Sequence, residues 1–182
     1  MPKIPLFFLI LLFVLWLGYE IKKSTRASKK NSEDFWDREN EALLTPRKST
    51  DDIHFIMIPK DLIPAPLSSV PEWAVALESD EDTDYEELLD DLNGLISELT
   101  KLSDSKIADL SAYTNTELRL KYGSPNFTEL SNADTAYTRL VQLMASLIGL
   151  LKVFKMNEEA RALLDFCKEE GISSSKINAL ND

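Results

Sequence analysis

An uncharged apolar stretch near the N-terminus constrains this chain more than any other feature. Residues 4–19 read IPLFFLILLFVLWLGY and contain no charged side chain. A helix over residues 4–21 is about 27 Å long at about 1.5 Å per residue, close to the roughly 30 Å hydrocarbon core of a bilayer. Trp16 and Tyr19 lie where aromatic side chains meet the membrane surface. The stretch therefore predicts a transmembrane anchor, residues 1–21, in contact with the lipid bilayer.

A cleaved signal peptide is the alternative interpretation of this stretch. The apolar region of a signal peptide normally has about 7–15 residues and ends at a small-residue cleavage site. Here the apolar run is longer and is followed by Glu20, Ile21 and Lys22, and the weak cleavage match at residues 25–27 lies among basic residues. These features favour an anchor that is retained.

The basic residues after the apolar stretch predict its orientation. They form a basic cluster of five cations within nine residues: Lys22, Lys23, Arg26, Lys29 and Lys30. Because a flank rich in Lys and Arg stays in the cytoplasm, we expect a single-pass protein of the cell membrane with its N-terminus outside and its C-terminal domain in the cytoplasm. The basic cluster also predicts attraction to anionic headgroups, at about 1 kcal/mol for each cation near the surface.

The charge of the chain is unevenly distributed. The net charge is −11, and residues 1–77 hold ten acidic and ten basic side chains, so residues 78–182 carry the whole acidic excess. Nucleic-acid affinity comes mainly from Lys and Arg contacts to phosphates, so the sequence predicts no nucleic-acid partner. The distal part, about 100 residues long, is sufficient for one small domain.

Residues 22–52 predict a basic juxtamembrane segment followed by an amphipathic stalk helix. Apolar residues recur at helical spacing over residues 32–44, with Ser32 as a possible N-cap, and the pattern ends before Pro46. This helix could also continue the membrane helix. Phe35 and Trp36 fit the headgroup region of a bilayer, or equally a contact with the domain or with a partner helix.

Residues 53–82 predict an extended linker that is rich in proline and acidic residues. The β-type run IHFIMI at 53–58 ends at Pro59, and the prolines that follow exclude a central strand or a helix. We expect a tether that can dock one apolar edge on the domain. His54 is the only histidine of the chain and has no Cys or His partner in sequence, so we interpret it as a loop residue.

An acidic run over residues 78–91 partly resembles a calcium-binding loop. Asp80, Asp82 and Asp84 have the spacing of EF-hand ligands, but Tyr85 stands where that loop needs glycine, and Asp91 stands where it needs glutamate. We therefore interpret the run as carboxylates gathered at the start of a helix. That helix is predicted by an apolar stripe: Leu88, Leu89, Leu92, Leu95, Ile96, Leu99 and Leu102.

Residues 83–182 predict an all-α bundle. Five helices are expected after the leucine stripe, at residues 104–110, 114–122, 132–155, 157–170 and 173–180. Thr114 and Glu117 have capping-box spacing, and Ser131 and Asp134 have a weaker form of it. Gly171 fits the C′ position of a Schellman motif.

Residues 131–182 resemble a degenerate tetratricopeptide hairpin. Ala160 fits the small second-helix position of that repeat, where two helices pack closely. The core positions would be filled by Leu147, Ile148, Leu151, Leu164 and Cys167. The usual glycines are replaced by Ile148 and Lys155, and about one repeat is present. The resemblance implies a helical hairpin that binds protein, with Cys167 as a core residue rather than a reactive thiol.

The whole chain also resembles a bacterial family of uncharacterised single-pass membrane proteins. The resemblance is carried by the short N-terminal span, by FWDREN at residues 35–40, by IHFIMIP at 53–59 and by residues 102–126, which contain YTNTELRLKYG. It implies an anchor joined to a helical domain and brings no known activity with it.

A candidate interaction surface lies around the caps of the predicted helix at residues 114–122. Its members, called here the 115–126 surface, are polar or aromatic: Asn115, Arg119, Lys121, Tyr122 and Asn126. Loops on rigid scaffolds often carry function. Plain capping and turn chemistry explains the same residues without a ligand.

No catalytic motif is visible in the sequence. It contains no glycine-rich phosphate loop, no nucleophile elbow and no paired Cys/His spacing. We therefore expect no catalytic residues, no metal, no cofactor and no small-molecule substrate. The function that we predict is a membrane-anchored module that presents its helical hairpin to a protein partner. A structural accessory subunit that binds another membrane protein through its span and stalk is the alternative, and an enzyme that uses carboxylates is the least favoured.

Overall fold

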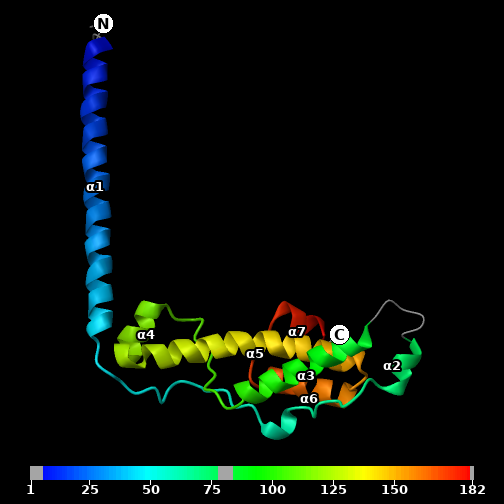
Figure 1. Cartoon of the computed structure of the whole chain (residues 1–182). Coiled ribbons are helices and arrows are strands. Elements are labelled where there is room, and N and C mark those ends of the chain that lie inside the picture. Colours follow the sequence, from blue (N-terminus) through cyan, green and yellow to red (C-terminus); the bar gives the residue numbers. More distant parts are fainter. Residues whose placement is uncertain (1–5, 78–83, 181–182) are drawn as a thin grey trace. The chain divides into compact units, whose positions relative to one another are not determined.

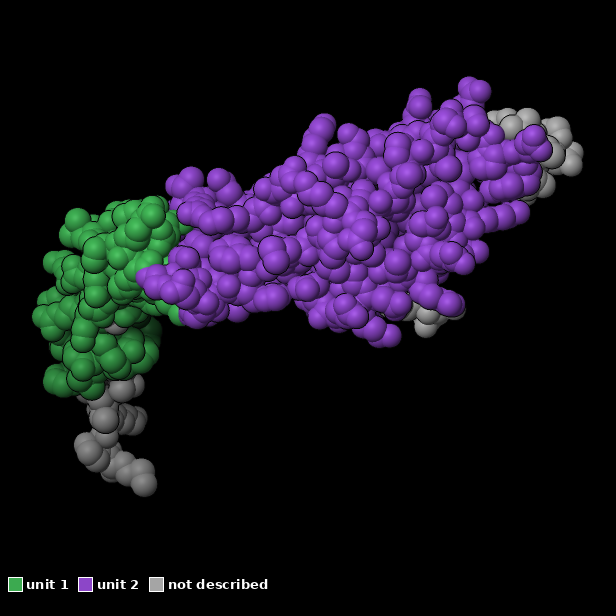
Figure 2. Space-filling model, turned by 90° about the horizontal axis from the view of Figure 1, so that it is seen from below, with its two compact units in different colours: residues 1–48, 114–126 green, residues 49–113, 127–182 purple. Residues whose placement is uncertain are grey.

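The computed structural model describes residues 6–77 and 84–180 of the chain, and every regular element in these ranges is helical (Figure 1). The predicted all-α class is confirmed. The chain forms two compact units, which Figure 2 colours separately. Unit 1 comprises residues 1–48 and 114–126, and unit 2 comprises residues 49–113 and 127–182. This division cuts across the predicted ranges 22–52 and 83–182.

Unit 1 is built on α1 (Leu6–Leu44), a single helix of 39 residues. Residues 22–44 contain neither glycine nor proline, so nothing in them interrupts the backbone hydrogen bonds. Ser32 therefore lies inside α1 and does not start a separate stalk helix. The helix stops before Pro46, as predicted.

The second helix of unit 1 is α4 (Asn115–Tyr122), which contacts α1 and the short 3-10 turn η2 (Ser124–Asn126). The predicted capping box is present, because the Glu117 amide donates to Thr114 Oγ1 at 3.3 Å and the Thr114 amide donates to Glu117 Oε2 at 2.9 Å. Gly123 ends α4 with φ of 92°. The local sequence signals therefore predicted both ends of α4 correctly.

Unit 2 is organised around α5 (Phe127–Val153), which packs against α3 (Tyr85–Leu102), α6 (Asn157–Glu169) and α7 (Ser175–Ala179) (Figure 1). The predicted stripe of α3 supplies buried side chains, including Leu92, Ile96 and Leu99. They meet a buried face of α5 made of Leu140, Met144, Leu147, Ile148 and Leu151.

Two helix ends within unit 2 are formed by local caps, and the one at Gly171 was predicted as a cap. Asp84 caps α3 by accepting from the amides of Glu86 and Glu87 at 3.1 and 3.0 Å. The Schellman motif is present at the end of α6, where the Ile172 amide donates to the Cys167 carbonyl at 2.7 Å and Gly171 has φ of 71°. These ends were predictable because the groups that form them are adjacent in sequence.

Two predicted helical features are wrong. No helix forms at residues 104–110, where the buried Ile107 pairs with Ile56 instead. In addition, α5 begins at Phe127 rather than near residue 132, and Asp134 does not serve as part of a cap. Its side chain accepts the Leu110 amide at 3.0 Å. In both cases a tertiary hydrogen bond replaces the predicted local one.

Residues 53–77 are part of the core of unit 2 rather than a free tether. The Ile56 amide donates to the Ile107 carbonyl at 2.8 Å, and Ile56 and Ile58 are 4% and 5% exposed. Two short helices follow, η1 (Lys60–Leu62) and α2 (Glu72–Leu77), and Trp73 of α2 lies edge-on to Tyr85. The predicted docking of one apolar edge is therefore observed, and it extends along most of the segment.

Candidate functional site

The first half of α1 exposes a continuous apolar surface. Eleven of its large apolar side chains are exposed, by 43% to 66%: Phe8, Ile10, Leu11, Leu12, Phe13, Val14, Leu15, Trp16, Leu17, Tyr19 and Ile21. No described part of unit 1 covers them. Trp16 and Tyr19, predicted to lie at the membrane surface, are 58% and 66% exposed at the C-terminal end of this surface.

The basic cluster lies on one side of α1, directly after the apolar surface. At about 100° per residue, its five cations fall within an arc of about 120° around the helix axis. All five are exposed. Lys23 pairs with Glu20 at 3.9 Å and Lys29 with Glu33 at 3.7 Å, so each of these two cations has a nearby carboxylate on the same helix. Along α1, the apolar surface is therefore followed by the basic cluster, which lies on one side of the helix.

Phe35 and Trp36 form an aromatic pair further along α1. They are 55% and 60% exposed, and their ring centroids lie 5.4 Å apart in an edge-on arrangement. Since neither ring is buried in unit 1, both remain available for a headgroup or a partner helix.

A different helix meets the length and hydropathy expected of a membrane span. Among the described residues, only Ser124–Val153 does so, with mean hydropathy 1.2 and a third of it buried. An 18-residue stretch of α1 that starts at Leu6 includes Glu20, Lys22 and Lys23, which makes it too charged by the same measure. The predicted N-terminal span is therefore not confirmed by this measure. The buried face of α5 packs on α3 and α6, which accounts for part of its apolarity.

The structure divides the 115–126 surface into exposed and buried members. Asn115 and Lys121 are exposed, Arg119 is half-buried, and Tyr122 and Asn126 are 2% and 5% exposed. The Asn126 side chain donates to the carbonyls of Lys48 and Tyr122, each at 2.8 Å. The last two residues therefore hold unit 1 together, and the accessible part of the predicted surface is confined to α4 itself.

An ion pair and a hydrogen bond join α4 to α1 within unit 1. Arg38 lies 3.5 Å from Glu117, and Thr116 donates to Glu39. The backbone and side-chain hydrogen bonds from Thr114 hold the pKa of Glu117 below its usual value, with a smaller contribution from the Arg38 charge. The negative charge of this carboxylate at neutral pH serves the cap and the contact with α1.

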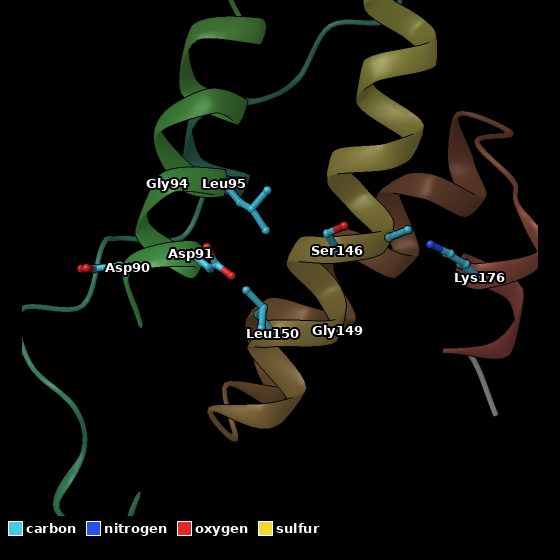
Figure 3. A pocket seen from close by; sticks show the side chains of 9 residues that line it. Asp90, Asp91, Gly94, Leu95, Ser146, Gly149, Leu150 and Lys176 are labelled. Atoms are coloured by element: carbon cyan, nitrogen blue, oxygen red, sulfur yellow. The ribbon is translucent and has the colours of Figure 1, made fainter. Parts of the chain in front are cut away.

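A groove in unit 2 was not predicted from the sequence (Figure 3). This α3–α5 groove encloses about 620 Å³ and is lined by Asp90, Asp91, Gly94 and Leu95 of α3, by Ala145, Ser146, Gly149 and Leu150 of α5, and by Lys176 of α7. Its floor is made of small and aliphatic residues, and charges of opposite sign stand on α3 and α7. The sequence signal for this groove was limited to one glycine inside each of two apolar helices, Gly94 in α3 and Gly149 in α5.

The chemically reactive residues form no evident centre in the described part of the chain. No group of three His, Cys, Asp or Glu side chains there is arranged to hold a metal ion. His54 Nε2 lies 2.8 Å from Glu170 Oε2 at an exposed site. Burial raises the pKa of the Cys167 thiol to about 11, so the thiolate is scarce at neutral pH. Asp80 and Asp82 of the calcium-like run lie outside the described residues.

Comparison with known proteins gives no further identification. No family model matches the sequence, and no curated protein or solved structure is significantly similar to it. The two resemblances noted in the sequence therefore remain predictions. The α5–α6 pair is a helical hairpin, but α5 alone has 27 residues, against about 34 for a complete two-helix tetratricopeptide repeat.

Proposed function

We propose that this chain is a membrane-anchored protein–protein interaction module, held by the first half of α1. The observation that carries the proposal is the apolar surface of α1, which the rest of unit 1, where described, leaves uncovered. Burying a large apolar side chain is worth about 1.5–3 kcal/mol, so eleven partly exposed ones leave on the order of 10 kcal/mol unrealised in water. A bilayer supplies that burial.

The dimensions and flanks of α1 agree with this role. Residues 6–21 span about 24 Å as a helix, slightly short of the hydrocarbon core, and a short span is accommodated by local thinning and by flanking residues that reach the interface. Trp16, Tyr19 and the basic cluster supply such flanks. We propose the orientation that the basic cluster favours, with the N-terminus outside and residues 22–182 on the cytoplasmic side.

The interaction part of the proposal concerns the helical surfaces of unit 2. Its α5–α6 hairpin carries the sequence resemblance to protein-binding repeats, and the α3–α5 groove offers an apolar floor between charged walls. Grooves of this kind accept helices of partner proteins. The proposed partner is therefore a protein, and no small-molecule chemistry is assigned.

Membrane anchoring is tested by alkaline extraction of membranes that contain the full-length chain. We expect the wild-type protein to stay in the pellet. Leu12→Arg combined with Leu15→Arg should release it, because each arginine near the centre of a span costs about 2.5–3.5 kcal/mol. Ser24→Arg combined with Ser28→Arg is the matched control, since it adds the same charge outside the apolar surface and should leave the protein in the pellet. Wild-type protein in the supernatant, or a central double variant that stays membrane-bound, would refute the anchor.

The orientation is tested with a C-terminal tag. A protease added to intact cells should leave the tag uncut, and permeabilised cells should lose it. Cleavage of the tag in intact cells would show that the C-terminal end of the chain lies outside the cell.

An accessory subunit is the second candidate function, supported by the exposed Phe35–Trp36 pair on α1. In this case the span and stalk, rather than unit 2, would hold a membrane protein. Replacing residues 4–19 by an unrelated apolar helix separates the two functions. Crosslinked partners recovered from membranes should be retained if unit 2 binds them and lost if the span does.

A further inference from the structure

The α3–α5 groove has walls of opposite charge. Figure 3 shows Asp91 of α3 and Lys176 of α7 on opposite sides of α5, each with its side chain directed toward that helix. The helix α5 contacts both α3 and α7, so it forms the floor between them. The groove therefore lies along α5 with the carboxylate of Asp91 as its acidic wall on one side and the ammonium group of Lys176 as its cationic wall on the other.

The floor of the groove contains glycines that the fold of the chain does not require. Gly94 and Gly149 lie inside α3 and α5, where glycine is the least favoured residue after proline. A Cβ atom added at either position meets nothing within 4 Å. Because no internal contact excludes a side chain there, these glycines leave room for something outside the chain.

The internal packing of unit 2 leaves some apolar surface open at the groove. Leu95, Ala145 and Leu150 at the groove are only partly buried. The groove thus leaves apolar surface next to charged walls.

We propose that a second copy of this chain docks in the α3–α5 groove, with the two α5 helices facing each other across a two-fold axis parallel to them. This inference deepens the proposed function, since it names the protein partner of the interaction module.

The charges of the walls favour this occupant and this symmetry. In an isologous dimer each patch meets its own copy. A two-fold axis parallel to α5 brings the acidic wall of one copy over the cationic wall of the other, so Asp91 faces the Lys176 of the second copy, and this happens twice. An axis perpendicular to α5 would place Asp91 over Asp91, which is repulsive. The small residues of the floor let the two α5 backbones approach each other.

A charge exchange tests the proposal. Asp91→Lys and Lys176→Glu should each weaken dimerisation of the full-length chain in detergent by at least about tenfold in Kd, because each creates two like-charge contacts. An equimolar mixture of the two variants should restore the dimer, since every contact is again between opposite charges. Glu158→Lys, the same type of change on α6, is the control and should leave the dimer intact. The measurement is sedimentation over a concentration series.

Crosslinking in membranes gives an independent test. Cys167 is the only cysteine and is buried, with a pKa of about 11, so a short bismaleimide reports mainly on an introduced thiol. Ser146→Cys, on the floor of the groove, should give a crosslinked dimer of the chain. Ser111→Cys, exposed in unit 2 outside the groove, should stay monomeric.

Three outcomes would overturn the dimer. They are a monomeric wild-type chain, a mixture of charge variants that stays monomeric, and a Ser146→Cys product that contains a different protein. Alkaline extraction of the same variants distinguishes these failures from failure of the anchor, because the groove substitutions lie outside α1.

Discussion

Replacing Gly123 by alanine should weaken the packing of α4 against α1. Gly123 has φ of 92°, a backbone conformation that an L side chain rarely adopts, and an added Cβ would lie 2.8 Å from Arg47 Cα and closer still to the Pro46 carbonyl oxygen. The neighbouring atoms are backbone, so they cannot rotate away. Backbone strain alone costs about 1–3 kcal/mol, and with the steric conflict we expect about 3 kcal/mol in total.

Amide hydrogen exchange measures the weakened packing of α4 against α1 at the backbone amides next to Gly123. The Lys48 amide donates to the Tyr122 carbonyl and the Ser124 amide donates to the Thr45 carbonyl, each at 3.0 Å. A loss of about 3 kcal/mol should speed the exchange of both amides by about 100-fold if they exchange through this opening.

Gly171→Ala is the control for strain without a steric conflict. Gly171 has φ of 71°, but an added Cβ there meets nothing within 4 Å. The Gly171→Ala substitution should destabilise the end of α6 by about 1 kcal/mol and leave the exchange rates of the Lys48 and Ser124 amides unchanged. Unchanged exchange of these two amides in Gly123→Ala would refute the packing argument.

Three further predictions concern unit 2. Ile56→Ala should lower the free energy of unfolding by about 2–4 kcal/mol in chemical denaturation, and Met57→Ala, at an 81% exposed site, by less than about 0.5 kcal/mol; equal effects would contradict the docking of residues 53–77. The hydrogen bond from Arg139 lowers the pKa of Glu98, so the stability it adds is present above the unfolded pKa of about 4.5 and is lost as the pH falls through the folded value. Glu98→Gln should therefore flatten the pH dependence of Tm below about pH 4.5, by a small amount because the pair is exposed, and an unchanged slope would contradict this. Cys167 should resist maleimide in the folded chain at pH 8 and react fully in denaturant, and rapid labelling of the folded chain would contradict its burial.

The sequence predicted the features that adjacent residues determine. The capping box of Thr114 and Glu117, the carboxylates at the start of α3 and the Schellman motif at Gly171 each need only a few neighbouring residues. The leucine stripe of α3 likewise predicts, from its helical spacing alone, which face of that helix is buried. The class and several helix ends were therefore accessible before any tertiary contact was known.

Features that depend on distant residues were missed. Ile107 looked helical by its local context but pairs with Ile56, 51 positions away. Asp134 looked like a cap but accepts the Leu110 amide. The neighbouring sequence does not distinguish these tertiary contacts from the helical and capping roles that were predicted.

The same reason applies to the candidate sites. Tyr122 and Asn126 were assigned to a binding surface because they are polar or aromatic near a turn, whereas both are buried, and both are hydrogen-bonded to the backbone of Lys48. The α3–α5 groove is lined by residues of three helices that are far apart in sequence, a juxtaposition that helical spacing alone does not reveal.

The unbroken course of α1 makes it a molecular ruler. On the proposed anchoring, residues 22–44 project about 34 Å past the apolar surface at about 1.5 Å per residue. The tip against which α4 packs then stands off from the lipid by a height that the number of residues determines. Removing seven residues, close to two helical turns, would lower that tip by about 10 Å while nearly preserving the direction in which it faces.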